Sequence, residues 1–377
     1  MRFNSVMKWV FILMIVCSCP VAAAEETMLP DLTLLENAVT ELDRALDGVF
    51  SLEDMYRSIL NGEFDFDISL ILEWIVSLLL GEIKTFSSLL SQLLMLGLFS
   101  AVLSVFADSF EGTASKVGHW VIFLAFLLVA IKNFNLALDI GTTAIGQAAD
   151  FLYAVMPVLL SSFALSGSVV AASVVQPMVL MVISLFLGMM ERFFLPLLLV
   201  MAALTVCSHL SPRYSFGKFS ELLRSIIMIS LGFLMTVFIG VLSLSGFASG
   251  TADGLGMKTV KMAAGNFIPL VGGYISDAFD SILGAGLLLR SSIGIFGVIA
   301  IGVVLIAPSL EILVMSFLFR FSAAVLQPFG DNTLVDSLSD LSSVLLVLFA
   351  LVAAAGLLFF FLIFCIVGVS SMTMMFR

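Results

Sequence analysis

Charged side chains are scarce in this chain, and long uncharged stretches take their place. Only 11% of its 377 residues are charged, whereas 61% are hydrophobic. A soluble domain carries about 25% charged residues, so this shortage excludes an ordinary soluble fold. Several apolar runs are long enough to cross a bilayer. The sequence therefore predicts an all-α, polytopic helical membrane protein.

Cysteine and histidine are also rare, with four and two residues respectively. The cysteines have no paired C-x-x-C spacing, so neither a zinc site nor a disulfide framework is predicted. His119 and His209 are isolated, and no G-x-S-x-G or H-E-x-x-H pattern occurs. Gly254–Thr259 superficially resembles a phosphate loop, but Met257 separates its glycine from its lysine. We therefore expect no cofactor, no metal and no enzymatic activity.

Residues 1–24 have the features of a signal peptide. Arg2 and Lys8 precede the apolar run Trp9–Val16, which is too short to span a membrane. Ala22–Ala24 offers a cleavage site of small residues. An uncleaved anchor is the alternative. If cleavage occurs, the chain from Glu25 onward begins outside the cytoplasm.

Most of the negative charge follows the signal peptide. The net charge is −11, and residues 25–67 contain twelve acidic and two basic side chains. Such a segment disfavours nucleic acid and anionic lipid, and it suits an extracytoplasmic location. Residues 25–87 are predicted to form an acidic amphipathic extracytoplasmic segment that ends in an interfacial helix, Ile68–Leu80, with Trp74 at headgroup level.

Spanning helices need about 20 apolar residues. The runs that qualify predict about six to eight spans, with a first membrane bundle over residues 88–247 and a C-terminal bundle over residues 293–377. The predicted spans are Leu89–Ala107, Trp120–Leu138, Phe151–Ser173, Gln176–Cys207, Ser225–Phe247, Ile293–Phe329 and Ser342–Gly368.

The loop charges predict an orientation but leave one conflict. The basic loop His209–Arg224 is expected in the cytoplasm, and the acidic loop Asp331–Asp340 on the other side. Counted from an external Glu25, a single crossing by Gln176–Cys207 would place the basic loop outside. Either that segment is a hairpin or broken helix, or one earlier segment does not span.

Glu191 and Arg192 interrupt the Gln176–Cys207 run at its midpoint. Adjacent residues on a helix do not face each other, so a direct ion pair is not expected. A turn at the membrane surface is one interpretation, and a functional intramembrane site is the other. Pro308–Glu311 is a second interruption. Two broken helices would suit the substrate site of an autonomous secondary transporter, which is the alternative function.

A glycine-rich charged insert, residues 248–292, separates the two bundles. Folding it back on itself would set Lys261 against Asp277 and Lys258 against Asp280. Arms of about nine residues would be roughly 13 Å long, the size of a re-entrant helical hairpin. A solvated loop with unrelated charges is the alternative. The residues that would form the turn are Asn266, Pro269, Gly272 and Gly273.

Three glycines at four-residue spacing lie at the start of this region: Gly246, Gly250 and Gly254. In a membrane helix, such spacing lets two backbones approach closely. A flexible exit from the preceding span is the alternative interpretation.

The run from Gly254 to Asp280, GLGMKTVKMAAGNFIPLVGGYISDAFD, resembles the most characteristic stretch of the stage III sporulation protein AE family. The order of signal peptide, acidic segment, spans and insert agrees with that family over essentially the whole chain. The resemblance implies an integral membrane subunit of a secretion-like transenvelope channel that connects mother cell and forespore and is required for endospore development. The implied location is the mother-cell membrane surrounding the forespore.

The same resemblance implies partners. They are the other stage III sporulation A-operon proteins, including a cytosolic ATPase and ring-forming components, and stage II sporulation protein Q on the forespore side. The lipid bilayer is the remaining implied contact, and nucleic acid is not one. No catalytic residues follow from the resemblance.

Overall fold

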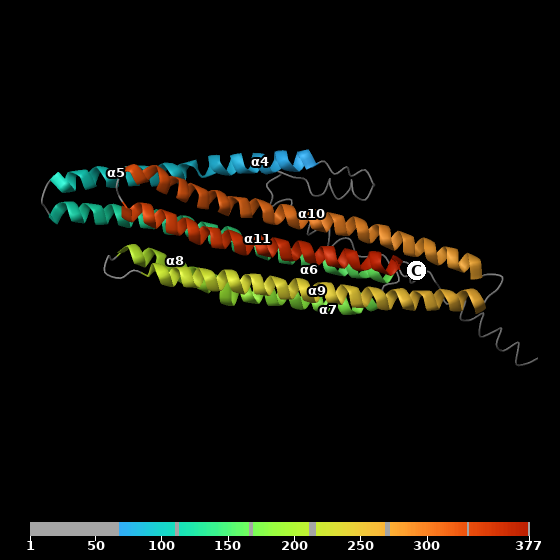
Figure 1. Ribbon diagram of the computed structural model, residues 1–377. Coiled ribbons are helices and arrows are strands. Elements are labelled where there is room, and N and C mark those ends of the chain that lie inside the picture. Colours follow the sequence, from blue (N-terminus) through green and yellow to red (C-terminus); the bar gives the residue numbers. More distant parts are fainter. Residues whose placement is uncertain are drawn as a thin grey trace, which may run out of the picture.

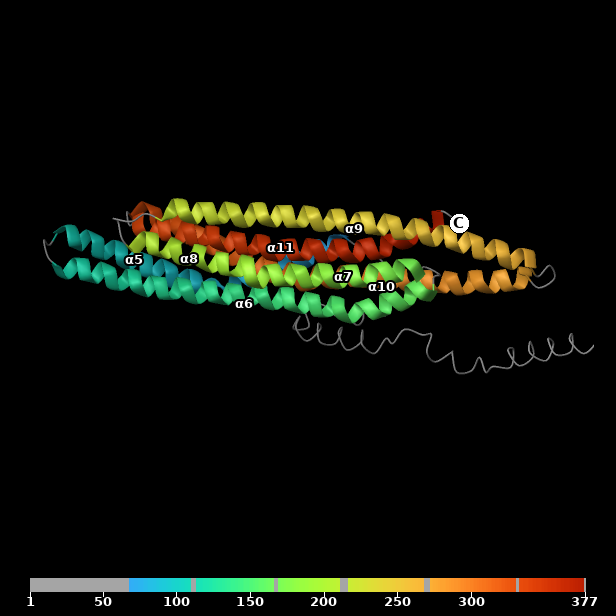
Figure 2. The ribbon, with the colours of Figure 1, turned by 90° about the horizontal axis from the view of Figure 1, so that it is seen from below.

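The protein is an elongated bundle of long helices, seen from two directions in a computed structural model (Figures 1 and 2). The described residues are 68–109, 113–165, 169–210, 216–267, 272–329 and 332–375. All secondary structure within them is helical. The predicted signal peptide, and the acidic segment up to residue 67, lie outside the described residues.

The helices follow one another with short connections. Their bounds are α4 (Ile68–Thr85), α5 (Ser87–Ser109), α6 (Thr113–Leu165), α7 (Val169–Met189), the π-helical turn η2 (Met190–Phe194), α8 (Leu195–Leu210), α9 (Gly217–Phe267), α10 (Gly272–Leu326), the 3-10 turn η3 (Gln327–Phe329) and α11 (Asn332–Met375).

Five stretches of helix within the described residues are long and apolar enough to cross a membrane. They are Val121–Leu159, Val175–His209, Gly217–Leu244, Ile293–Phe329 and Thr333–Val367. The α4–α5 pair, bent by 43° at its junction, makes a sixth if it is counted as one span. The predicted class of polytopic helical membrane protein is confirmed, with the number of spans at or just below the lower end of the expected range.

The number is lower because α6 is one helix. The sequence predicts separate spans at Trp120–Leu138 and Phe151–Ser173, but α6 continues for 53 residues and includes most of both. Residues 139–150 contain no proline to end a helix. If α4 and α5 together make one crossing, the topological conflict disappears, because Trp120–Leu138 and most of Phe151–Ser173 belong to one helix and do not cross separately. Val175–His209 is a single continuous path, neither a hairpin nor a broken helix.

The two polar loops lie at the same end of the bundle, which corrects the predicted orientation. Nε2 of His209, at the end of α8, lies 3.0 Å from Oδ2 of Asp340, in the first turns of α11. The end of α8 and the first turns of α11 therefore lie at one end of the bundle (Figure 1). Counting the charges of each loop separately could not reveal that loops of opposite charge lie beside each other.

α11 lies at the centre of the bundle and packs against α6, α8, α9 and α10. Its sequence is apolar on all sides from Leu345 to Ile366, which suits a helix surrounded by others. Phe359 is completely buried. Its ring packs edge to face against the ring of Phe186 in α7, with the two ring centroids 5.7 Å apart. Such pairs of aromatic rings contribute beyond their buried area.

Gly141 marks a close approach of α6 to the α10–α11 pair. A Cβ atom at this position would lie 3.0 Å from Val352 and 3.3 Å from Ile312. We expect Gly141→Val to lower the free energy of unfolding by about 1–3 kcal/mol, because it over-packs this contact. Thermal unfolding of the purified full-length protein in detergent measures the change.

Gly240→Val in α9 is the matched control, because a Cβ atom there has nothing within 4 Å. It should leave the unfolding temperature nearly unchanged. Equal losses at the two glycines would show that the close approach of α6 to α11 is not what Gly141 provides.

α9 and α10 continue past the C-terminal end of α11 as neighbouring helices (Figure 1). In α9 no charged residue occurs between Arg224 and Asp253, and the helix itself has 51 residues and ends at Phe267. At 1.5 Å per residue α9 is about 76 Å long, well beyond the roughly 30 Å core of a bilayer. We call residues 245–267 and 272–292 the extended pair. The arms of the predicted hairpin are thus helical and continuous with α9 and α10.

Candidate functional site

Glu191 and Arg192 lie in η2, a single turn of π-helix between α7 and α8. The N–H of Leu195 donates to the carbonyl oxygen of Met190, five residues earlier. Pro196 has no N–H to offer to the carbonyl of Arg192, which favours this wider turn. The chain therefore continues through the charged pair without breaking.

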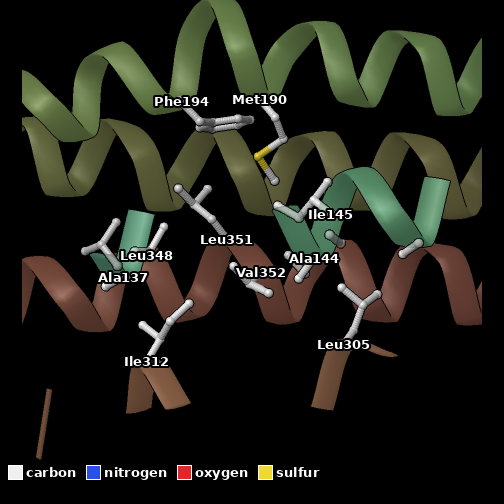
Figure 3. Packing of buried hydrophobic residues seen from close by; sticks show 14 of the residues in the cluster. Ala137, Ala144, Ile145, Met190, Phe194, Leu305, Ile312, Leu348, Leu351 and Val352 are labelled. Atoms are coloured by element: carbon white, nitrogen blue, oxygen red, sulfur yellow. The ribbon is translucent and has the colours of Figure 1, made fainter. Parts of the chain in front are cut away.

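The π turn keeps one apolar face toward the core. The buried side chains of this segment recur every four residues, at Phe186, Met190, Phe194 and Leu198. In an α-helix each such step turns the face by about 40°, and the wider turn offsets that drift. Met190 and Phe194 both point toward Leu351 of α11 (Figure 3). The same geometry leaves Glu191 and Arg192 exposed.

α6 also has an exposed polar face. Its members are Lys132, Asp139, Thr143 and Asp150. At about 100° per residue, these four positions lie within roughly 40° of one another around the helix. They lie inside the apolar stretch Val121–Leu159 and extend for about 27 Å along it. This length is close to the roughly 30 Å thickness of a bilayer core.

Contacts between α6 and α7 bring these two sets of charges to one region (Figure 2). Thr142 and Gly146 of α6 and Glu191 of η2 line a common cavity of about 80 Å³. Further along, the hydroxyl oxygens of Tyr153 in α6 and Ser184 in α7 lie 3.3 Å apart. We use the name charged face for a set of exposed residues on α6, α7 and η2. They are Lys132, Asp139, Thr143, Asp150, Ser184, Glu191 and Arg192.

The charges of this face are not neutralised within the described part of the chain. Within that part, none of the five charged side chains of the face has an ion-pair partner. They are Lys132, Asp139, Asp150, Glu191 and Arg192. A charged side chain at the centre of a membrane helix costs about 2.5–3.5 kcal/mol on insertion scales. Lipid is therefore an unfavourable neighbour, and the charged face is suited to contact with protein or water.

The second predicted interruption, Pro308–Glu311, does not break its helix. α10 continues through Pro308 from Gly272 to Leu326. The hydroxyl of buried Ser309 donates to the carbonyl of Leu305 within the same helix. Such local bonds let proline occur within a membrane helix. The structure therefore contradicts the predicted pair of broken helices.

The other predicted site residues belong to the extended pair. Pro269 lies outside the described residues, as do the side chains of the others, so the proposed ion pairs stay a prediction. Those in α9 are Gly246, Gly250, Gly254, Lys258, Lys261 and Asn266, and those in α10 are Gly272, Gly273, Asp277 and Asp280.

A charge swap tests the predicted pairing of Lys261 with Asp277. Each single change, Lys261→Asp or Asp277→Lys, should lower the free energy of unfolding by about 0.2–1 kcal/mol, the range of exposed pairs. The double variant should recover the loss in thermal unfolding. Lys258→Asp combined with Asp277→Lys is the mismatched control. Direct pairing is wrong if the matched double variant is no more stable than the singles.

Sequence interpretation missed Asp139 and Asp150. It ended one span at Leu138 and began the next at Phe151, so both acids fell in an expected loop. The available signal was their spacing, because Lys132, Asp139 and Asp150 recur at intervals of seven and eleven residues. These intervals return to one face of a helix.

Comparison with known proteins identifies the family. The sequence profile of Stage III sporulation protein AE matches residues 50–370. The chain belongs to the stage III sporulation protein AE family. Among its relatives in that family is Stage III sporulation protein AE of Bacillus subtilis (strain 168), which is 30% identical over 319 residues, 84% of this chain and 80% of that protein. No solved structure gives a significant match.

This result confirms the resemblance seen in the run from Gly254 to Asp280. The stage III sporulation protein AE family is named for sporulation, and neither matching description names an enzyme. The chain is therefore a sporulation protein of the helical membrane class.

Proposed function

We propose that this protein is an integral membrane subunit of a secretion-like transenvelope channel between mother cell and forespore. In this role it is needed for endospore development and is not an enzyme. The observation that carries the proposal is the charged face. Asp139, Glu191 and Arg192 are exposed within apolar stretches of helix and have no ion-pair partner in the described chain. A subunit whose surface is covered by other protein, or by the water of a conduit, accounts for such residues.

Membership of a sporulation family supports the biological setting. The location that we propose is the mother-cell membrane around the forespore. The proposed partners are the other stage III sporulation A-operon proteins, including a cytosolic ATPase and ring-forming components, and stage II sporulation protein Q.

The extended pair is the second element suited to assembly. In α9 it runs from residue 245 to Phe267, a length of about 34 Å. A partner outside the bilayer core is within its reach. Cysteines at Asn266 and Gly273 should form crosslinks to other components of the complex in sporulating cells. Labelling by lipid alone at both positions would count against assembly through this element.

An autonomous permease is the alternative, and reconstitution separates the two. A channel subunit in liposomes should transport nothing until its partners are added, whereas a permease should transport alone. The structure favours the first, since α10 is unbroken at Pro308 and the described helices lack the matched pair of interruptions that the permease requires. Transport by the purified chain alone would overturn the proposed role.

A further inference from the structure

We propose that two copies of this chain pair across the charged face as a parallel dimer with two-fold symmetry. Asp139 of each copy would bind Arg192 of the other. The two side chains are exposed, carry opposite charge, and have no ion-pair partner in the described part of their own chain.

Asp139 and Arg192 lie within two helical turns of each other in depth. Thr142 lies beside Glu191 at the shared cavity, and Tyr153 lies beside Ser184. Rising numbers on α6 thus match falling numbers on α7, so the two helices are antiparallel. Asp139 is three residues before Thr142, and Arg192 is one residue after Glu191. Counted from Thr142 and Glu191 their depths differ by about 3 Å, and counted from Tyr153 and Ser184 by about 9 Å.

This similar depth makes the surface complementary to itself. Copies inserted in the same orientation are related by an axis along the membrane normal, so residues of equal depth can face each other. In such a two-fold interface, residue i meets residue j and residue j meets residue i. One Asp139–Arg192 contact therefore occurs twice, and both exposed charges are neutralised without another kind of protein.

Lipid is a poor substitute for the second copy. Arg192 lies well inside Val175–His209, a stretch long and apolar enough to cross a membrane. Lipid tails offer no counter-charge to a guanidinium inside such a stretch. A carboxylate from a neighbouring helix reaches that depth directly.

Small residues beside the charges allow two helices to approach. Thr143 is exposed on α6 between Asp139 and Asp150. A Cβ atom at Gly146, one turn further, would have nothing within 4 Å. Small residues of this kind line close helix contacts in membranes. The dimer rests on the proposal that protein covers the charged face and names that protein, and it can be tested without the channel because it concerns only the binding of the chain to itself.

Cysteine crosslinking of the full-length chain in membranes of a non-sporulating host tests the dimer. Its four native cysteines are first replaced by serine. Thr143→Cys should then give an oxidised dimer, whereas Ile229→Cys should not. Ile229 is the control because it is 73% exposed on α9, which contributes no residue to the charged face. Equal dimer formation at the two positions, or an adduct of Thr143→Cys with a host protein instead, would overturn the proposal.

A charge swap in the Thr143→Cys background tests the ion pair. D139R or R192D alone should reduce the dimer by about tenfold or more, the factor that corresponds to 1.4 kcal/mol. The D139R/R192D double variant should return it to within about twofold. A double variant as poor as the singles would overturn the pairing.

Milder variants keep the test decisive if the swapped chains accumulate poorly. D139N preserves side-chain size and R192Q keeps a polar side chain without the charge, and each should still reduce the crosslinked fraction several-fold. Undiminished crosslinking in both would contradict the pairing. Because no sporulation protein is present in this host, a missing dimer would leave the channel role to be judged separately by reconstitution.

Discussion

Replacing Phe359 by alanine should lower the free energy of unfolding by about 3–5 kcal/mol, the largest effect on stability that we expect. Phe359 is fully buried in the central helix α11, where its ring meets that of Phe186. Its loss would leave a cavity where α7 and α11 meet, and would remove an edge-to-face contact. Thermal unfolding of the purified full-length protein in detergent measures the effect.

The next residue in the chain provides a matched control. Phe360 is 42% exposed, and its ring is parallel to that of Phe364, with the ring centroids 6.5 Å apart. Phe360→Ala should therefore cost less than about 1 kcal/mol, because it opens no enclosed cavity. If the two alanine variants unfolded at the same temperature, α11 could not be the central helix of the bundle.

Arg192→Leu should have the largest effect on function while sparing the fold. Removing an exposed charge from mid-span relieves a cost of insertion, so stability should be unchanged or higher. Heat-resistant spore counts should nevertheless fall by about tenfold or more, since the charged face loses the group that its partner binds. The opposite directions of the two effects distinguish an assembly residue from a structural one.

Leu199→Ala is the control for Arg192→Leu, because Leu199 is 48% exposed on α8 but uncharged. It should leave spore counts near those of the parent strain. Normal spore formation by the Arg192 variant, or a fall in step with its unfolding temperature, would remove the functional role of that arginine.

The sequence alone predicts the helical class and most of the spans, because long apolar runs have no alternative in a membrane. It does not predict the continuity of α6, since the glycines, threonines and acids between Leu138 and Phe151 resemble a loop. Only tertiary packing shows otherwise, with Gly141 set against Val352 and Ile312. The helical state of residues 139–150 depends on neighbours that are more than 150 residues away in the sequence.

Part of the candidate site could be predicted from the sequence. Glu191 and Arg192 stand out because they are charged within an apolar run, but their π turn depends on Pro196 and on buried residues spaced by four. Asp139 belongs to the same site only because α6 and α7 are antiparallel neighbours. The charges of the loops gave a wrong orientation in one place. They predicted that His209–Arg224 and Asp331–Asp340 lie on opposite sides, whereas His209 contacts Asp340.

The central claim is that protein covers the charged face, and site-specific photo-crosslinking in sporulating cells tests it most directly. A photoreactive residue at Thr143 lies between Asp139 and Asp150 on the exposed side of α6. The account predicts protein adducts at Thr143 and lipid adducts alone at Ile229, which is also exposed but lies on α9 outside the charged face. Lipid adducts alone at Thr143 would contradict it.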